Sequence, residues 1–117
     1  MIGSKNKTYF TKGELECKCC GKCNLTKDFE EHLLALRIIF GRSMKVNSCF
    51  RCEKHNKDIG GAKSSYHVKG MAIDIAIPDG QYRADLATKA FALGWSVGTY
   101  KTFLHLDRRK TQTSFQG

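Results

Sequence analysis

Residues 71–77 of the chain read Met-Ala-Ile-Asp-Ile-Ala-Ile, and this stretch decides the fold. Large apolar side chains alternate with small or polar ones, a pattern that predicts a β-strand with one face in the core. The core-facing residues are expected to be Met71, Ile73, Ile75 and Ile77. Asp74 faces the other way between Ala72 and Ala76, which leaves space around its carboxylate. Because an unpaired carboxylate is costly to bury, Asp74 needs a metal ion, another cation or several hydrogen-bond donors.

The segments on either side of this strand predict an α+β domain, with a small antiparallel sheet and helices packed on one side of it. The expected elements are helices at 26–40 and 81–93, strands at 44–48, 71–77, 95–97 and 102–107, an irregular cysteine-rich segment at 1–25 and a long loop at 50–66. Apolar residues recur at helical spacing in the first helix, at Phe29, Leu33, Leu36 and Phe40. Loops as long as 50–66 are often functional in a compact domain.

Size and charge narrow the classes of function. The chain has 117 residues and a mass of 13.2 kDa, which suits a single domain over 1–117. Hydrophobic residues make up 41%, which excludes a disordered chain, and no apolar run is long enough for insertion into a membrane. The net charge of +9 favours an anionic partner. Because the basic residues are scattered and not interleaved with aromatic ones, an anionic cell-wall polymer is favoured over nucleic acid.

Six cysteines lie near the N-terminus and around the start of the long loop, at Cys17, Cys19, Cys20, Cys23, Cys49 and Cys52. Cys20–Cys23 and Cys49–Cys52 have the spacing of metal knuckles, which makes a structural zinc site one interpretation. Disulfides from the first group to Cys49 or Cys52, or free thiols, are the alternatives. In each case, the cysteines are expected to fasten the N-terminal segment to the core.

Two further motifs carry candidate metal ligands. Residues 65–74 have the form SxHxxGxAxD, with His67 and Asp74, and residues 105–107 have the form HxD, with His105. Two histidines and one aspartate form a typical catalytic zinc set, which leaves the fourth position for water. Taken alone, His67 is explained as a surface residue and His105 as a core residue. Together with Asp74 in its alternating strand, they predict a metal centre.

These motifs resemble the zinc peptidase family of D-alanyl-D-alanine carboxypeptidases and L-alanyl-D-glutamate endopeptidases, and especially its small phage and bacterial branch. The resemblance covers most of the chain, including 47–74, 94–100 and 103–107. It implies the metal fold that this family shares with the hedgehog signalling domain, and it implies His67, Asp74 and His105 as zinc ligands. It also implies that Arg51 holds a substrate carboxylate or peptide carbonyl. The guanidinium group independently suits this role, because its planar fork matches a carboxylate.

The catalytic base is where the sequence departs from the family. Many relatives have Glu or Asp three residues before the last histidine ligand, whereas this chain has Thr102. We therefore expect Asp107, on the same strand face as His105, to act as the base. The alternative is that Asp107 orients His105 or pairs with Arg108.

The resemblance implies a monomeric zinc metallopeptidase that hydrolyses stem peptides of bacterial peptidoglycan, as a D,D-carboxypeptidase or an endopeptidase. A phage endolysin or a virion-associated lysin would fit. Residues 1–16 lack the apolar block of a secretory signal, so we expect synthesis in the cytoplasm and action on the wall after phage-type release or from a virion. The alternative is a zinc-binding domain without catalysis, which binds cell wall or a partner protein.

Overall fold

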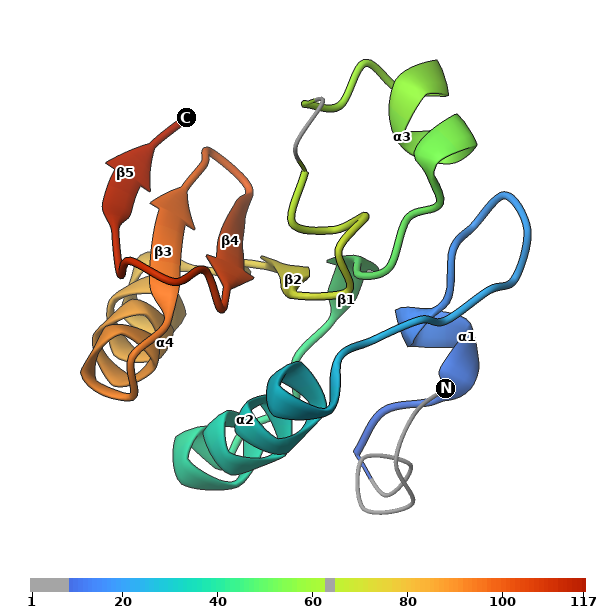
Figure 1. The fold of residues 1–117 in the computed structure, drawn as a ribbon. Helices are drawn as coiled ribbons and strands as arrows, with labels where there is room; N and C mark the ends of the chain where they lie inside the picture. The colour runs from blue at the N-terminus through green and yellow to red at the C-terminus, as the bar shows by residue number, and fades with distance from the viewer. Residues whose placement is uncertain (1–8, 63–64) are drawn as a thin grey trace.

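The computed structural model describes residues 9–62 and 65–117, and it confirms the predicted α+β class. Five strands form one sheet in the order β1-β2-β4-β3-β5, and Figure 1 shows α2 and α4 on one side of it with α3 on the other. The elements are α1 (Lys12–Leu15), α2 (Lys27–Phe40), β1 (Val46–Ser48), α3 (Glu53–Asp58), β2 (Ala72–Ala76), α4 (Gly80–Ala92), β3 (Ser96–Thr99), β4 (Phe103–Asp107) and β5 (Ser114–Gln116).

The two long helices begin at side-chain caps and cover the apolar face of the sheet. Thr26 accepts a hydrogen bond from the backbone N–H of Phe29 at the start of α2, and Asp79 accepts one from Tyr82 at the start of α4. The predicted stripe of α2 is buried in full, which confirms that the helix was placed correctly. Within the described part of the chain, no helix is long and apolar enough to cross a membrane.

The central strands β2 and β4 run antiparallel and divide their side chains between two faces. Ile73 and Ile75 of β2 and Leu104 and Leu106 of β4 are completely buried in the main hydrophobic core, together with residues of α2 and α4. Asp74 lies directly opposite His105 on the other face. The strand register therefore brings together two of the residues that the sequence predicted as metal ligands.

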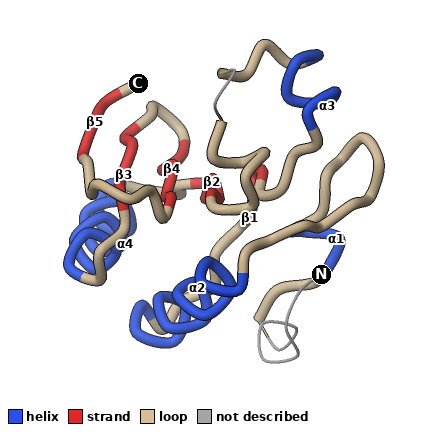
Figure 2. Tube along the Cα trace, in the orientation of Figure 1, coloured by secondary structure: helices blue, strands red, loops and turns tan. Residues whose placement is uncertain are grey.

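Three short elements differ from the sequence expectation. β5 pairs parallel to β3, so the sheet is mixed and not wholly antiparallel. The predicted loop 50–66 contains α3 (Figure 2), and the segment 1–25, expected to be irregular, contains α1. These elements are three to six residues long and lack an apolar period, so neither periodicity nor length indicates them. Residues 1–8 of the predicted N-terminal segment lie outside the described residues.

Candidate metal centre

His67, Asp74 and His105 converge at one wall of a cavity on the polar face of the sheet. Nε2 of His67 lies 3.1 Å from Oδ2 of Asp74, and Nδ1 of His105 lies 2.9 Å from Oδ1 of the same carboxylate. One donor atom from each of the three residues lies within 4.8 Å of the others. The structure thus brings together all three predicted ligands, from a turn and from two paired strands.

The hydrogen bonding of His67 shows that this cluster suits a cation. Nδ1 of His67 lies 2.7 Å from the backbone carbonyl oxygen of Cys49. A carbonyl only accepts, so Nδ1 carries a proton, and Nε2 is the ring nitrogen left to contact Asp74. Nε2 lies 3.1 Å from the carboxylate of Asp74, so a positive charge, either a proton or a metal ion, belongs between the two atoms. A metal ion supplies such a charge, and a second-shell carbonyl is the usual partner of a metal-ligating imidazole.

His105 lies between two carboxylates. Its Nδ1 faces Asp74, and its Nε2 lies 2.7 Å from Oδ2 of Asp107. Burial alone would lower the pKa of His105, but hydrogen bonds to Asp107 and Asp74 raise it to about 8. Burial would raise the pKa of Asp74, but hydrogen bonds from His105 and His67 lower it to about 2. The carboxylate of Asp74 is therefore ionised at neutral pH, as a metal ligand must be. The donor set of two imidazoles and one carboxylate fits zinc.

Asp107 is completely buried beneath His105, and both of its oxygens are engaged. Arg109 donates from Nε to Oδ1 over 2.8 Å and from Nη2 to Oδ2, and its backbone N–H also donates to Oδ1. Burial would raise the pKa of Asp107, but the hydrogen bonds from Arg109 and His105 lower it to about 2. This arrangement fits the orientation of His105 better than the role of a base. The sequence analysis considered an ion pair between Asp107 and Arg108. In the structure, Asp107 pairs with Arg109 instead, a residue that the sequence analysis did not single out.

Arg51 reaches the same cavity from the segment before α3. Its Nη2 lies 3.9 Å from Oδ2 of Asp74, and its Nη1 donates to Oδ1 of Asn56 over 3.0 Å. Asn56, buried in α3, also donates to the carbonyl of Ala62 over 2.8 Å. A Cβ atom at Gly61 would lie 2.0 Å from Oδ1 of Asn56, so only glycine allows this contact. Asn56 is a positioning residue that the sequence analysis missed, because a single buried amide in a polar segment gives no periodic signal.

The cavity around these residues has a volume of about 620 Å³. Ile59, Gly60, Gly61 and Ala62 line one side, and Tyr100 and Phe103 line the other, with their rings stacked 4.5 Å apart. Among the described lining residues, Asp74 is the only carboxylate. Thr102 is exposed and does not line the cavity. Tyr100 and Phe103 give the cavity an apolar surface.

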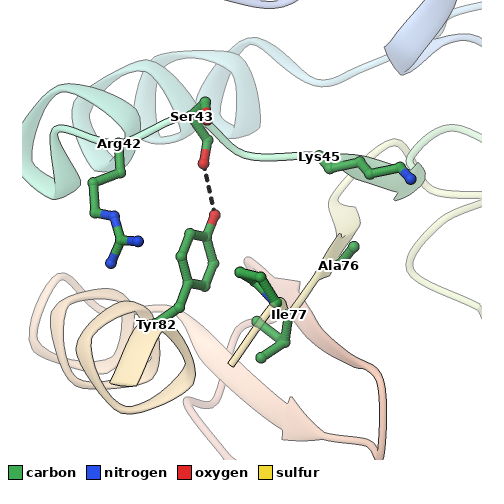
Figure 3. Close-up of a pocket in the computed structure, with 7 residues that line it drawn as sticks. Arg42, Ser43, Lys45, Ala76, Ile77 and Tyr82 are labelled. Atoms are coloured by element: carbon green, nitrogen blue, oxygen red, sulfur yellow. Dashed lines mark hydrogen bonds between the residues drawn. The ribbon is translucent and has the colours of Figure 1, made fainter. Parts of the chain in front are cut away.

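A second cavity of about 410 Å³ lies at the end of β2, beside α4. Figure 3 shows Tyr82 donating a hydrogen bond to the carbonyl of Ser43, with Arg42 and Lys45 nearby. The guanidinium of Arg42 lies over the ring of Tyr82. The described lining contains no histidine, cysteine or carboxylate. The groups suited to hydrolysis are therefore in the larger cavity.

The cysteines are divided differently from the predicted knuckle pairs. No disulfide joins the six cysteines, all of which lie in the described ranges. Cys23 and Cys49 are part of the hydrophobic core, so the pairs Cys20–Cys23 and Cys49–Cys52 are wrong as metal knuckles. Their partners in sequence, Cys20 and Cys52, instead lie close to Cys17.

The fold and the donor set define a metallohydrolase-like α+β domain, with its centre on the polar face of a mixed sheet. The family model of Peptidase M15 matches residues 8–107, and the chain therefore belongs to this family of zinc peptidases. No curated protein sequence matches the chain. The match spans all three candidate ligands, Arg51 and Asp107.

Proposed function

We propose that the protein hydrolyses peptide bonds in the stem peptides of bacterial peptidoglycan, with zinc held by His67, Asp74 and His105. The observation that carries this proposal is the convergence of His67 Nε2, at 3.1 Å, and His105 Nδ1, at 2.9 Å, on the carboxylate of Asp74. A zinc ion at that point supplies Lewis acidity for attack of water on a peptide carbonyl. Membership of a peptidase family supports the reaction class.

Arg51 is proposed to bind a carboxylate or a carbonyl of the substrate. Its side chain is 12% exposed, and Nη1 is held by Asn56, so the planar group is oriented before the substrate arrives. Burial lowers the pKa of Arg51 from its ordinary value, while the nearby Asp74 raises it. Stem peptides carry free carboxylates, and the guanidinium fork matches them in two hydrogen bonds. The charge of +9 also favours approach to an anionic wall.

Asp107 and Arg109 are proposed to position His105. Nε2 of His105 faces Asp107 and Nδ1 faces Asp74. With zinc bound, Asp107 would accept from Nε2, and the lone pair of Nδ1 would be directed at the metal. Arg109 holds the Asp107 carboxylate through both oxygens. Carboxylate–histidine–metal arrangements of this kind fix the tautomer and the direction of the ring.

Digestion of purified peptidoglycan by the zinc-loaded protein tests the proposal. Mass spectrometry of the products is expected to show either loss of a terminal D-alanine or cleavage between L-alanine and D-glutamate. The first product identifies a D,D-carboxypeptidase and the second an endopeptidase. The matched control is His67→Ala, which should release neither product. Intact wall peptides after incubation with protein that contains zinc at this site would refute the proposal.

A zinc-binding domain without catalysis is the second candidate. It is favoured by one observation, namely that the described lining of the cavity offers no carboxylate besides Asp74 to accept a proton. This candidate predicts co-sedimentation of the zinc-loaded protein with cell walls and no change in the wall peptides. The same digestion therefore decides between the two candidates.

A further inference from the structure

A group of sulfur atoms lies beyond the catalytic cavity, where the N-terminal segment meets the start of α3. Sγ of Cys17 lies 3.7 Å from Sγ of Cys52. The sulfurs of Cys17, Cys20 and Cys52 all lie within 4.8 Å of one another. A second set with the same spacing contains Cys17, Cys19 and a ring nitrogen of His55. The two sets share Cys17, and together they contain four cysteines and one histidine.

The backbone around Cys17 is folded so that two sulfurs face the same way. Gly21 donates from its N–H to the carbonyl of Cys17 over 2.9 Å, and Cys17 donates to the carbonyl of Lys22 over 2.7 Å. Gly21 has a φ angle of 73°, a conformation that favours glycine. This turn places Cys17 and Cys20, three residues apart, on one side. The C-x-x-C pair within this cluster is therefore Cys17–Cys20.

Backbone N–H groups point at the sulfurs from both segments. The N–H of Cys52 lies 3.4 Å from Sγ of Cys17, and the N–H of His55 lies 3.4 Å from Sγ of Cys52, the cap of α3. Donors of this kind stabilise the thiolate, which is the form that binds a metal.

The sulfur spacing fits a metal better than a disulfide. A disulfide needs an S–S distance of about 2.05 Å. Two thiolates bound to tetrahedral zinc at about 2.3 Å each are separated by about 3.8 Å. The 3.7 Å between Cys17 and Cys52 matches the second value. A disulfide between these two would also leave Cys20 and His55 beside it without a role.

We propose that Cys17, Cys20 and Cys52, with His55 as the fourth ligand, bind a structural zinc ion. Cys17–Cys20 and Cys52–His55 are then two ligand pairs, each three residues apart, from the two segments that the ion joins. His55 and Cys19 both belong to the second set of close donors, which shares Cys17 with the first. His55 is chosen over Cys19 because Cys19 is adjacent to Cys20 in the chain. Because a metal-ligating imidazole is neutral, this donor set would carry one negative charge less than four thiolates would.

This site lies next to the segment that builds one wall of the catalytic cavity. Cys52 directly follows Arg51, and the carbonyl of Cys49 accepts from the ring of the catalytic ligand His67. A metal at the cysteines fixes one end of residues 49–52, and the core side chain of Cys49 fixes the other. The structural ion therefore helps to position Arg51. The value of this positioning for substrate binding rests on the proposed function.

Metal content tests the site independently of activity. Protein purified under reducing conditions with zinc is expected to hold about two zinc ions per chain, because the two donor sets are separate. Cys20→Ser should remove about one, and the exposed position of Cys20 means that the core is untouched. His67→Ala should also remove about one, from the other site. Cys23→Ala, a cysteine outside the cluster, is the matched control and should retain both.

Cobalt substitution identifies which site is lost. Thiolate-bound cobalt gives a sulfur-to-metal charge-transfer band in the near ultraviolet, whereas the His67, Asp74 and His105 set contains no sulfur. The band should persist in His67→Ala and disappear in Cys20→Ser, so failure of this site and failure of the catalytic site are distinguishable. An unchanged band and metal content in Cys20→Ser would overturn the proposal. So would a Cys17–Cys52 disulfide, seen as a loss of about 2 Da.

The fourth ligand is tested by a pair of variants. His55→Gln should weaken zinc binding at the cysteine site, and Cys19→Ser should leave it unchanged. The opposite result would show that Cys19, not His55, completes the site, and it would overturn the assignment of His55.

Discussion

The two walls of the candidate catalytic cavity are held in place by different means. Asp74 and His105 project from paired strands whose other faces are buried in the core, so their separation is set by the sheet register. Arg51 projects from an irregular segment, and a side-chain hydrogen bond to Asn56 directs it. The metal-binding wall therefore depends on the whole fold, whereas the Arg51 wall depends on a few local contacts. We expect variants of the first wall to remove chemistry and variants of the second to weaken substrate binding.

Loss of a metal ligand should have the largest effect. His67→Ala removes the imidazole that faces Asp74 and is expected to lower hydrolysis by about 10³-fold or more, with loss of the catalytic zinc. The measurement is turnover of wall peptides together with metal content. His32→Ala is the matched control, because His32 is on α2 and its ring contacts Asp28 outside the site. Retention of both zinc and activity in His67→Ala would contradict the assignment.

Arg51→Lys should affect the other wall alone. Lysine keeps the charge but cannot form two parallel hydrogen bonds, so kcat/KM should fall by about 10²-fold while zinc content stays unchanged. Arg42→Lys, at the second cavity, is the matched control and should behave like the wild type. If Arg51→Lys lost zinc as well as activity, the two walls would not be independent.

The same difference explains which parts of the site were predictable from sequence. Alternation in 71–77 and 102–107 indicated both strands and the shared face of Asp74 and His105, because period-two patterns report burial directly. Asn56 and Arg109 were missed because their roles depend on hydrogen bonds to Arg51 and Asp107 that no local pattern encodes. The cysteine grouping was also mispredicted, because equal C-x-x-C spacings do not reveal which sulfurs enter the core.

Asp107→Asn tests how the metal-binding wall is supported. Asparagine still accepts a hydrogen bond from His105 but loses the charge that Arg109 holds. An orienting role predicts that zinc affinity and activity fall together, by about 10- to 100-fold. A role as the base predicts a loss of about 10²- to 10⁴-fold in turnover with unchanged zinc affinity. Asp85→Asn, in an ion pair with Lys89 on α4, is the matched control.

The smallest expected effect is on the unfolding free energy of the protein after a chelator has removed zinc. It comes from His105, which belongs to the metal-binding wall. Hydrogen bonds to Asp107 and Asp74 raise the pKa of His105 to about 8, above the value of 6.5 expected in the unfolded chain. A group with a raised folded-state pKa stabilises the fold fully below pH 6.5, and that contribution is lost as the pH rises through 8. It corresponds to about 2 kcal/mol of unfolding free energy.

Urea unfolding of the chelated protein and of His105→Gln between pH 6 and 9 measures this contribution as a difference between the two proteins. The comparison is needed because Cys17, whose folded-state pKa is lowered to about 7, gains stabilisation as the pH rises over the same range. That opposing contribution is common to both proteins and cancels. The advantage of the wild type over His105→Gln should therefore shrink as the pH rises. A constant difference would show that Asp74 and Asp107 do not hold His105 as a cation, and that the strand register alone supports this wall.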